Sequence, residues 1–279
     1  MIELHSPELK WAYALSSSSD GSYNRAYQKE AGLSVSPELS LGIGYENKKY
    51  NDSVSDVSFN KQALKIYTSN QISSMFKDNT EAQILRSTLE ESKNQILLLN
   101  LNSDIKINKF LGLKTGYKSE LLDFNKSLFS RQLKVDHLFL KSNFYITQSG
   151  LGNYTELMKS YLNDGNQRFL LFSSLYQNIG KKKYLKAGIN YLNLNFQESK
   201  PADYFSPLNH QQLEVFLGFN YKTKSKNTTA VQLESAYGYQ WNSVVEELTL
   251  RAKLSVVQRF KSIEAELYGQ YSTAANATF

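Results

Sequence analysis

The chain has 279 residues, no cysteine and a formal net charge of +6. Its length suits one large domain or two small ones, and the lack of cysteine excludes both a disulfide framework and a thiolate metal site. No stretch of about eighteen apolar residues occurs, so the sequence also excludes a transmembrane helix.

The positive charge does not by itself identify a partner. Lysine and glutamate are interleaved along the chain, which favours a solvated surface over attraction to acidic lipid headgroups or to an anionic polymer. Nucleic-acid binding requires basic residues and stacking aromatic residues on the same face. Here aromatic and charged residues alternate onto opposite faces, so we expect no nucleic-acid partner.

Alternation of apolar and polar residues is the main pattern near the start of the chain. A strand places successive side chains on opposite faces. The alternation therefore predicts strands at residues 9–15, 23–35, 39–45 and 59–69, with a tight turn at Ser36-Pro37 between the second and the third.

The next segment is ambiguous. Thr80 is a suitable helix cap, and Ile84, Leu85 and Leu89 lie close to helical spacing. The sequence therefore leaves a short helix at residues 80–91, which would plug a lumen or lie in a loop, as the alternative to a poorly alternating strand.

Further strands are predicted in the middle of the chain. They cover residues 96–101, 111–117, 133–139, 154–161, 169–175 and 185–191, with breaks at Ser103-Asp104 and Lys109-Phe110 and turns at residues 149–153, 163–166 and 178–181. The apolar residues then shift to Leu192, Leu194 and Phe196, which predicts a β-bulge. A long loop at residues 198–209 follows.

The strongest alternation lies near the C-terminus, at residues 213–221, 231–241, 248–256 and 263–271. Short polar linkers join these segments, so they form an antiparallel meander of long strands. Its apolar face is predicted to face lipid. The candidate lipid-facing residues are Leu213, Val215, Leu217, Phe219, Val231, Leu233, Leu248, Leu250, Leu254, Ile263 and Leu267.

The opposite face of the meander is polar and charged. Its plainest interpretation is ion pairing between neighbouring strands, and its functional interpretation is a wet lumen along which a hydroxyl-rich polymer slides through weak contacts. Phe216 and Tyr268 are candidates for stacking on a sugar ring. The candidate lumen-lining residues are Gln212, Glu214, Phe216, Gln232, Glu234, Arg251, Lys253, Glu264, Glu266 and Tyr268.

The length of these segments distinguishes two all-β classes. Strands of soluble sandwiches are usually about five or six residues long, whereas transmembrane strands need about 9–11 residues and carry aromatic residues at both interfaces. The alternation here persists for about ten residues, with Tyr or Trp near strand ends. We therefore predict an all-β, antiparallel, up-and-down transmembrane β-barrel of about 14–16 strands. A soluble β-protein, with its apolar faces packed on each other, is the alternative.

The segment Tyr204-Phe205-Ser206-Pro207 is followed by an alternating strand that ends Leu217-Gly218-Phe219-Asn220-Tyr221. Together they resemble the C-terminal barrels linked to periplasmic tetratricopeptide repeats in bacterial exopolysaccharide secretion, of the cellulose synthase type and the poly-N-acetylglucosamine porin type. The resemblance covers roughly the last 80 residues. It implies a passive outer-membrane pore of about 16 strands for a sugar polymer, with a periplasmic helical-repeat scaffold as partner. Similar barrels also serve lipoprotein surface display, which leaves the cargo open.

The two ends of the chain determine the domain prediction. The N-terminus lacks the basic and apolar regions of a signal peptide, although an outer-membrane protein of a Gram-negative bacterium must be exported. Before Phe279, residues 273–278 are small and polar, which predicts a closing strand that is short or absent. We therefore expect residues 1–279 to form a single outer-membrane barrel domain, the C-terminal part of a longer chain.

The sequence contains no recognisable catalytic or metal-binding motif. The histidines are His5, His137 and His210, and none has metal-ligand spacing or a serine placed beside it by a motif. His137 alternates with Val135 and Phe139, so we expect it to pack on an apolar face. We expect no enzyme activity, no metal and no cofactor, with outer-membrane lipid and a polysaccharide as partners. A barrel enzyme that modifies surface lipids is a further alternative, and it would require polar catalytic residues clustered near one rim.

Overall fold

The computed structural model of this chain consists of β-strands and the segments that connect them. It describes residues 8–17, 23–36, 38–52, 57–89, 92–122, 132–146, 148–180, 184–200, 204–223, 228–242, 246–260 and 263–273. Within these ranges, no helix is long and apolar enough to span a membrane. Pro37 of the predicted turn, and residues 274–279 of the predicted short closing strand, lie outside the described residues.

Fifteen strands are present in the described part of the chain. They are β1 (Glu8–Ser17), β2 (Tyr23–Ser34), β3 (Leu39–Asp52), β4 (Val57–Ser73), β5 (Phe76–Leu89), β6 (Ser92–Lys106), β7 (Leu111–Leu121), β8 (Lys134–Ile146), β9 (Leu151–Leu162), β10 (Gln167–Ile179), β11 (Leu185–Phe196), β12 (His210–Lys222), β13 (Thr228–Trp241), β14 (Glu246–Phe260) and β15 (Ile263–Ser272). Their lengths run from 10 to 17 residues. These strands are therefore longer than the five or six residues that are typical of soluble sheets.

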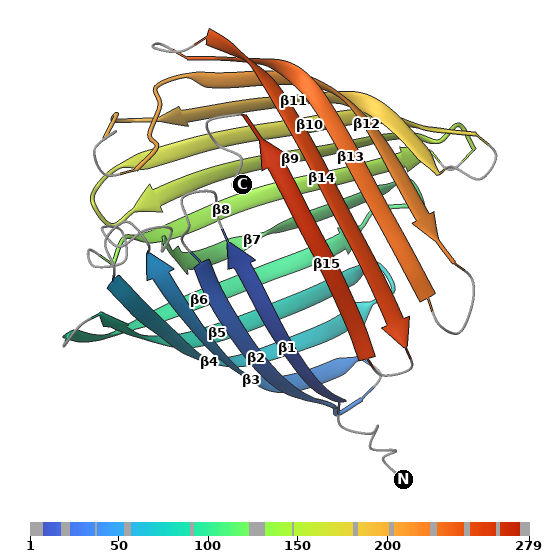
Figure 1. Cartoon of the computed structure of the whole chain (residues 1–279). Coiled ribbons are helices and arrows are strands. Elements are labelled where there is room, and N and C mark those ends of the chain that lie inside the picture. The colour runs from blue at the N-terminus through green and yellow to red at the C-terminus, as the bar shows by residue number, and fades with distance from the viewer. Residues whose placement is uncertain are drawn as a thin grey trace. The chain divides into compact units, whose positions relative to one another are not determined.

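The strands follow one another in the sheet in the order in which they occur in the chain. The order runs from β1 to β15 without a crossover, as Figure 1 shows for successive arrows. Short connections between antiparallel neighbours produce such an order, because a hairpin needs only a few residues to reverse the chain. The predicted all-β, antiparallel, up-and-down fold is confirmed, and the described strands fall within the predicted number.

The turn predicted at residues 163–166 is present between β9 and β10. Gly165 has a φ of 89°, and its amide donates a hydrogen bond to the carbonyl of Leu162 at 3.0 Å. Glycine adopts this left-handed conformation without steric cost. The turn predicted at residues 149–153 is shorter than expected, because β9 already begins at Leu151.

By their internal contacts the residues form two compact units. The first unit consists of Met1–Ile107, Leu113–Phe139 and Ser160–Gly165, and the second of Asn108–Gly112, Leu140–Lys159 and Asn166–Phe279. The first unit therefore contains β1 to β6, and the second contains β10 to β15.

In the first unit, strand pairing overrides the helical spacing of residues 80–91. The predicted helix is wrong, because β5 pairs along its length with β4 and β6. Ile84 lies opposite Leu64 in β4 and opposite Leu97 in β6, and all three side chains are exposed on the same face. Cross-strand neighbours, which local spacing does not reveal, favour the strand here.

The break predicted at Ser103-Asp104 is also wrong, since β6 continues to Lys106. Ser103 donates a hydrogen bond to Asp78 in β5, and Asn79 Nδ2 donates to Asp104 Oδ2 at 3.2 Å. The polar side chains therefore join neighbouring strands instead of making a turn. The other predicted break, Lys109-Phe110, does lie in the connection between β6 and β7.

In the second unit, the β-bulge predicted in β11 is absent. β11 pairs in a continuous register with β10 and β12. Leu185 and Ile189 are exposed on one face, whereas Leu192, Leu194 and Phe196 are buried on the other. The shift in the apolar pattern therefore marks a small buried cluster on the second face and not a change of register.

Candidate functional site

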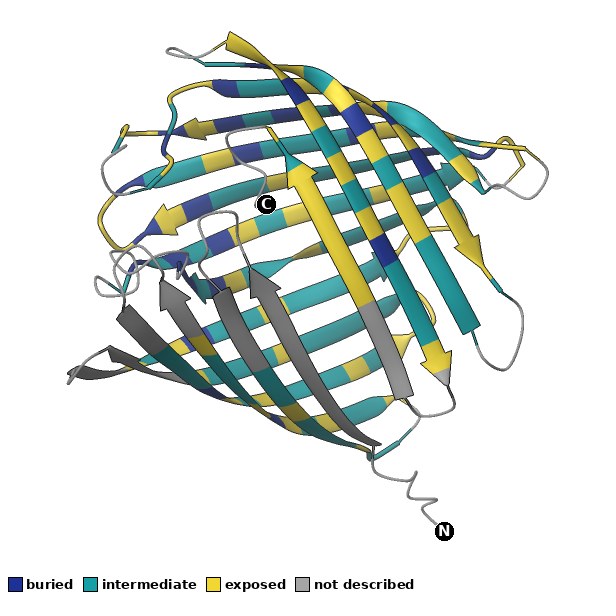
Figure 2. Cartoon of the chain, viewed as in Figure 1, coloured by how far each residue is buried: buried dark blue, intermediate teal, exposed yellow. Residues whose placement is uncertain are grey.

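The registers of β12, β13 and β14 place apolar side chains in rows on one face of the second unit. Leu213 lies opposite Tyr239, and Leu233 lies opposite Leu254. These side chains are exposed, and Val215 reaches 57%. Figure 2 shows the resulting bands of buried and exposed residues along the strands. Adjacent rows of exposed leucine, valine and tyrosine make a larger apolar patch than soluble monomers usually carry.

Most residues that the sequence predicts to face lipid belong to this exposed apolar face. The exposed members are Leu213, Val215, Leu217, Leu233, Leu248, Leu250, Leu254 and Leu267. Phe219 and Val231 are half-buried, and the side chain of Ile263 lies outside the described residues. Contact of these residues with lipid remains a prediction.

The opposite face of the same strands carries a charged network centred on Arg251 in β14. The Arg251 guanidinium donates hydrogen bonds to Glu214 Oε2 in β12 and to Glu234 Oε1 in β13, each at 3.0 Å. Gln212 Nε2 donates to the other carboxylate oxygen of Glu214 at 2.7 Å. Because Glu214 is only 4% exposed, its charge requires this compensation. The ion pairs that the sequence predicts between neighbouring strands are present here.

Gly238 in β13 makes room for this network. It lies opposite Glu214 in the register of β12 and β13. A Cβ at Gly238 would overlap the carbonyl oxygen of Leu213 and would lie 2.7 Å from Glu214 Cα and 2.8 Å from Glu214 Cγ. A glycine at this position therefore allows β12 to approach β13 closely.

Aromatic rings on the charged face lie over glycines of neighbouring strands. Phe216 in β12 is 5% exposed, and a Cβ at Gly188 in β11 would lie 2.7 Å from its ring. The Tyr176 ring covers Gly152 in the same way. Lys186 Nζ lies 3.9 Å from the centre of the Tyr176 ring and 5.2 Å from that of Phe216. The Phe216 ring is thus used for packing, and little of it remains for the sugar stacking that the sequence suggested.

The structure brings only some of the predicted lumen-lining residues together. Glu214 and Phe216 are buried, Gln212, Glu234, Arg251 and Lys253 are half-buried, and Gln232 and Tyr268 are exposed. The Tyr268 ring is half exposed and has Lys253 Nζ at 5.4 Å from its centre. The side chains of Glu264 and Glu266 lie outside the described residues.

Asn166, which sequence reasoning missed, anchors the loop between β11 and β12. Its side chain is fully enclosed, and its Nδ2 donates hydrogen bonds to Tyr204 Oη at 2.8 Å and to the carbonyl of Glu198 at 2.9 Å. The Tyr204 ring lies 5.9 Å from that of Phe196 in the buried cluster. The loop therefore closes over the apolar end of this face.

The rest of the Tyr204-Phe205-Ser206-Pro207 motif is also packed. Ser206 is buried and donates a hydrogen bond to the carbonyl of Tyr204 at 3.2 Å. The Phe205 ring meets the buried His210 ring edge-on at 5.6 Å. The motif therefore has a structural role at the start of β12.

The first unit holds a hydrogen-bonded chain of side chains that no sequence motif indicates. His137 Nδ1 in β8 lies 2.8 Å from Ser160 Oγ in β9, and His137 Nε2 lies 3.0 Å from Glu120 Oε1 in β7. These residues are 17 and 23 positions apart in the chain, so their proximity depends on strand pairing. His137 packs as predicted in that it is buried, but its neighbours are polar. The exposed apolar face of β8 carries Leu138 and Leu140 instead.

The accessibility of this chain of groups limits its chemistry. Ser160 is 0% exposed, whereas the Glu120 side chain is 35% exposed. A serine nucleophile must reach its substrate. Here the carboxylate is the accessible end, so Ser160 is not presented as a nucleophile. Across the described strands and turns, no group of three or more histidine, aspartate or glutamate residues is arranged to hold a metal ion.

Comparisons with known proteins give one informative result. No family model matches the chain, and no curated protein matches it. Among solved structures, the chain is similar to one described as "Bacterial polysaccharide outer membrane secretin", with a TM-score of 0.73 and 9% sequence identity. The match covers 95% of this chain and 90% of that chain. At this identity, the similarity shows a shared fold.

Proposed function

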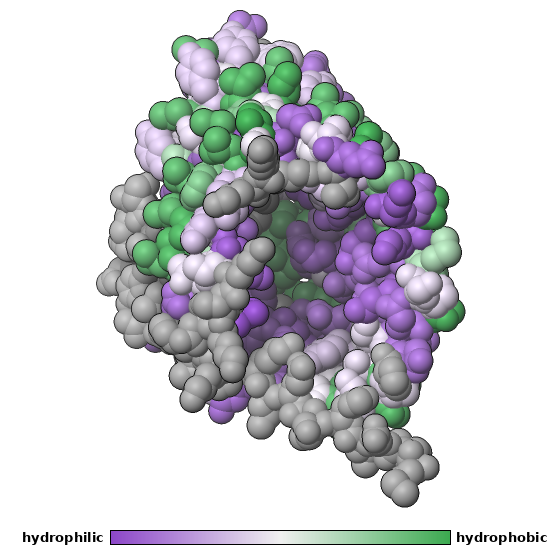
Figure 3. Space-filling view, turned by 90° about the vertical axis from the view of Figure 1, so that its right-hand side faces the viewer, coloured by the Kyte–Doolittle hydropathy of each residue, from purple (hydrophilic) through white to green (hydrophobic). Residues whose placement is uncertain are grey.

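We propose that this chain is an outer-membrane β-barrel pore through which a polysaccharide passes. The observation that carries the proposal is the reversed polarity of the sheet in the second unit. Apolar rows on β12 to β14 are exposed, while Glu214, Glu234 and Arg251 form a network on the opposite face. Transmembrane barrels have this arrangement, with apolar residues toward lipid and polar residues toward the interior. Figure 3 shows hydrophilic and hydrophobic residues gathered in separate areas of one face.

The similarity to a polysaccharide outer-membrane secretin supports both the location and the cargo in this proposal. The sequence resemblance described above supports the same class of cargo and adds a periplasmic helical-repeat scaffold as a proposed partner. We propose a passive channel, because transport of a polymer along a wet lining requires only weak contacts at many positions. The buried Ser160 gives no support to the alternative of a barrel enzyme.

Electrical recording in planar lipid bilayers tests the pore. The purified protein is expected to produce discrete current steps with weak selectivity between cations and anions, because the charges of the Arg251 network compensate one another. The matched control is the same preparation after heat unfolding, which should produce none. Properly folded protein that enters the bilayer without current steps would contradict the proposed function.

A further inference from the structure

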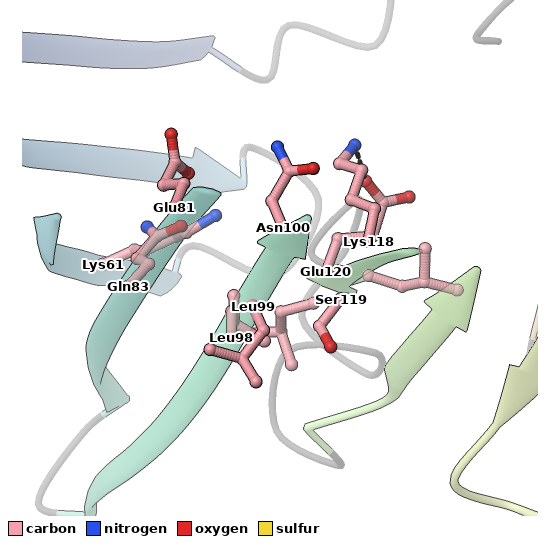
Figure 4. A pocket seen from close by; sticks show the side chains of 11 residues that line it. Lys61, Glu81, Gln83, Leu98, Leu99, Asn100, Lys118, Ser119 and Glu120 are labelled. Carbon is pink, nitrogen blue, oxygen red and sulfur yellow. Dashed lines mark hydrogen bonds and ion pairs between the residues drawn. The ribbon is translucent and has the colours of Figure 1, made fainter. Parts of the chain in front are cut away.

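The first unit contains a cavity of about 230 Å³ on the polar face of β4 to β7. Pockets for drug-sized ligands typically enclose roughly 300–1,000 Å³, so this cavity suits a smaller group such as one sugar ring. Figure 4 shows Glu81, Asn100, Lys118 and Glu120 projecting to the same side of the sheet. The buried Leu98 lies beside them.

The polar lining of the cavity is balanced in charge and rich in hydrogen-bonding groups. Its charged side chains are two lysines and two glutamates, Lys61, Lys118, Glu81 and Glu120. Gln83 and Asn100 add an amide each, and an amide offers both donors and acceptors. Such a lining matches sugar hydroxyls, which both donate and accept. It gives no net attraction to a charged ligand.

Glu120 is held in place from behind, which distinguishes this cavity from an ordinary surface hollow. One carboxylate oxygen contacts His137 Nε2 at 3.0 Å, and His137 in turn contacts the fully buried Ser160. The other carboxylate oxygen pairs with Lys118. A binding group whose rotamer is fixed by buried neighbours loses little conformational entropy when a ligand arrives. His137 and Ser160 therefore act as positioning residues for a carboxylate that faces the cavity.

We propose that this cavity is a binding subsite for one uncharged pyranose unit of the polymer. The inference rests on the proposed function, because the polymer is the source of the sugar. Glu120 accepts hydrogen bonds from ring hydroxyls, and Asn100 and Gln83 supply further donors and acceptors. Among the described residues no aromatic side chain lines this cavity, so hydrogen bonds replace stacking and the affinity is weak. Weak binding suits a channel, since a transported chain must leave each site it occupies.

Binding of oligosaccharides to the folded protein in detergent micelles tests the subsite. The neutral probes are cellohexaose, maltohexaose and chitohexaose, and the anionic probe is hexagalacturonate. We expect at least one neutral probe to bind at millimolar concentration in saturation-transfer NMR. The variants Asn100→Ala and Glu120→Gln should each weaken that binding by about fivefold, the effect of one lost hydrogen bond. Heat-modifiable electrophoretic mobility confirms that each variant is folded.

Glu46→Gln is the matched control. Glu46 pairs with Lys65 at 3.0 Å in the same unit but does not line the cavity, so its loss should leave binding unchanged. The proposal is overturned if no neutral probe binds, if both cavity variants bind as the unchanged protein does, or if hexagalacturonate binds more tightly. Bilayer recording separates this result from the proposed function. Current steps without sugar binding would reject only the subsite, and binding without current steps would reject only the pore.

Discussion

Replacing Gly238 with alanine is expected to destabilise the protein by about 3 kcal/mol, at the upper end of the range for overpacked sites. The new methyl group would overlap the carbonyl oxygen of Leu213 and lie 2.7 Å from Glu214 Cα. Both are backbone atoms of β12, so no side-chain rotation relieves the overlap. The strands must separate at the position where Glu214 enters the Arg251 network.

Gly218→Ala is the matched control for this substitution. Gly218 lies on the same face in the neighbouring strand, but the nearest atoms to a Cβ there are 3.7 Å away. An alanine at position 218 should change stability by less than about 1 kcal/mol, since it also reduces the freedom of the unfolded chain. Urea unfolding in phospholipid vesicles, followed by tryptophan fluorescence, measures both variants. Equal stabilities for the two would contradict the close approach of β12 and β13.

Replacing Arg251 with methionine is expected to cost about 3 kcal/mol, because removing one partner of a buried ion pair leaves the other charge uncompensated. Arg251 serves two carboxylates at 3.0 Å, and the side chain of Glu214 is only 5% exposed. The loss of the guanidinium therefore leaves Glu214 buried with only the Gln212 amide as a hydrogen-bond donor among the contacts described above. The same urea titration measures the effect.

Two further variants show whether the charge of Glu214 is the cause. Lys253→Met removes a cation from the same face of the same strand, where its ammonium lies 5.4 Å from the Tyr268 ring; an exposed contact of this kind is worth about 0.5–1 kcal/mol. Adding Glu214→Gln to Arg251→Met should recover at least half of the lost stability. If the double variant is no more stable than Arg251→Met, the explanation by an uncompensated carboxylate is wrong.

The fold was largely predictable because alternation is a local property of a strand. In β12, for example, Leu213, Val215 and Leu217 alternate with polar residues in the sequence and are exposed as a row in the structure. The prediction failed where neighbours on other strands decide the outcome. Residues 80–91 have near-helical spacing, yet Ile84 joins a row with Leu64 and Leu97 that is assembled only by pairing.

The charged face was predictable in composition but not in geometry. Sequence alternation placed Glu214, Glu234 and Arg251 on one face, but it could not show that one guanidinium serves both carboxylates. That contact depends on the relative register of three strands. Gly238 is likewise visible in the sequence only as a small residue, and its role depends on the backbone atoms that it faces.

The contacts of Asn166 and His137 were beyond sequence reasoning for a related reason. Asn166 reaches Tyr204 across 38 positions, and His137 reaches Ser160 across 23. Neither pair has a fixed spacing that a motif could capture. The buried cluster of Leu192, Leu194 and Phe196 was misinterpreted as a bulge, because the loop that packs beside it is not apparent from the alternation of β11.

Fluorescence quenching by lipids with brominated acyl chains tests the central claim, that the exposed apolar face contacts membrane lipid. Leu233 and Gln232 are adjacent in β13, both are exposed, and they lie on opposite faces of the sheet. Single tryptophans are introduced as Leu233→Trp and Gln232→Trp after Trp11 and Trp241 are replaced by phenylalanine. Strong quenching at position 233 and weak quenching at position 232 is the expected result. Equal quenching at both positions, or stronger quenching at position 232, would contradict the account.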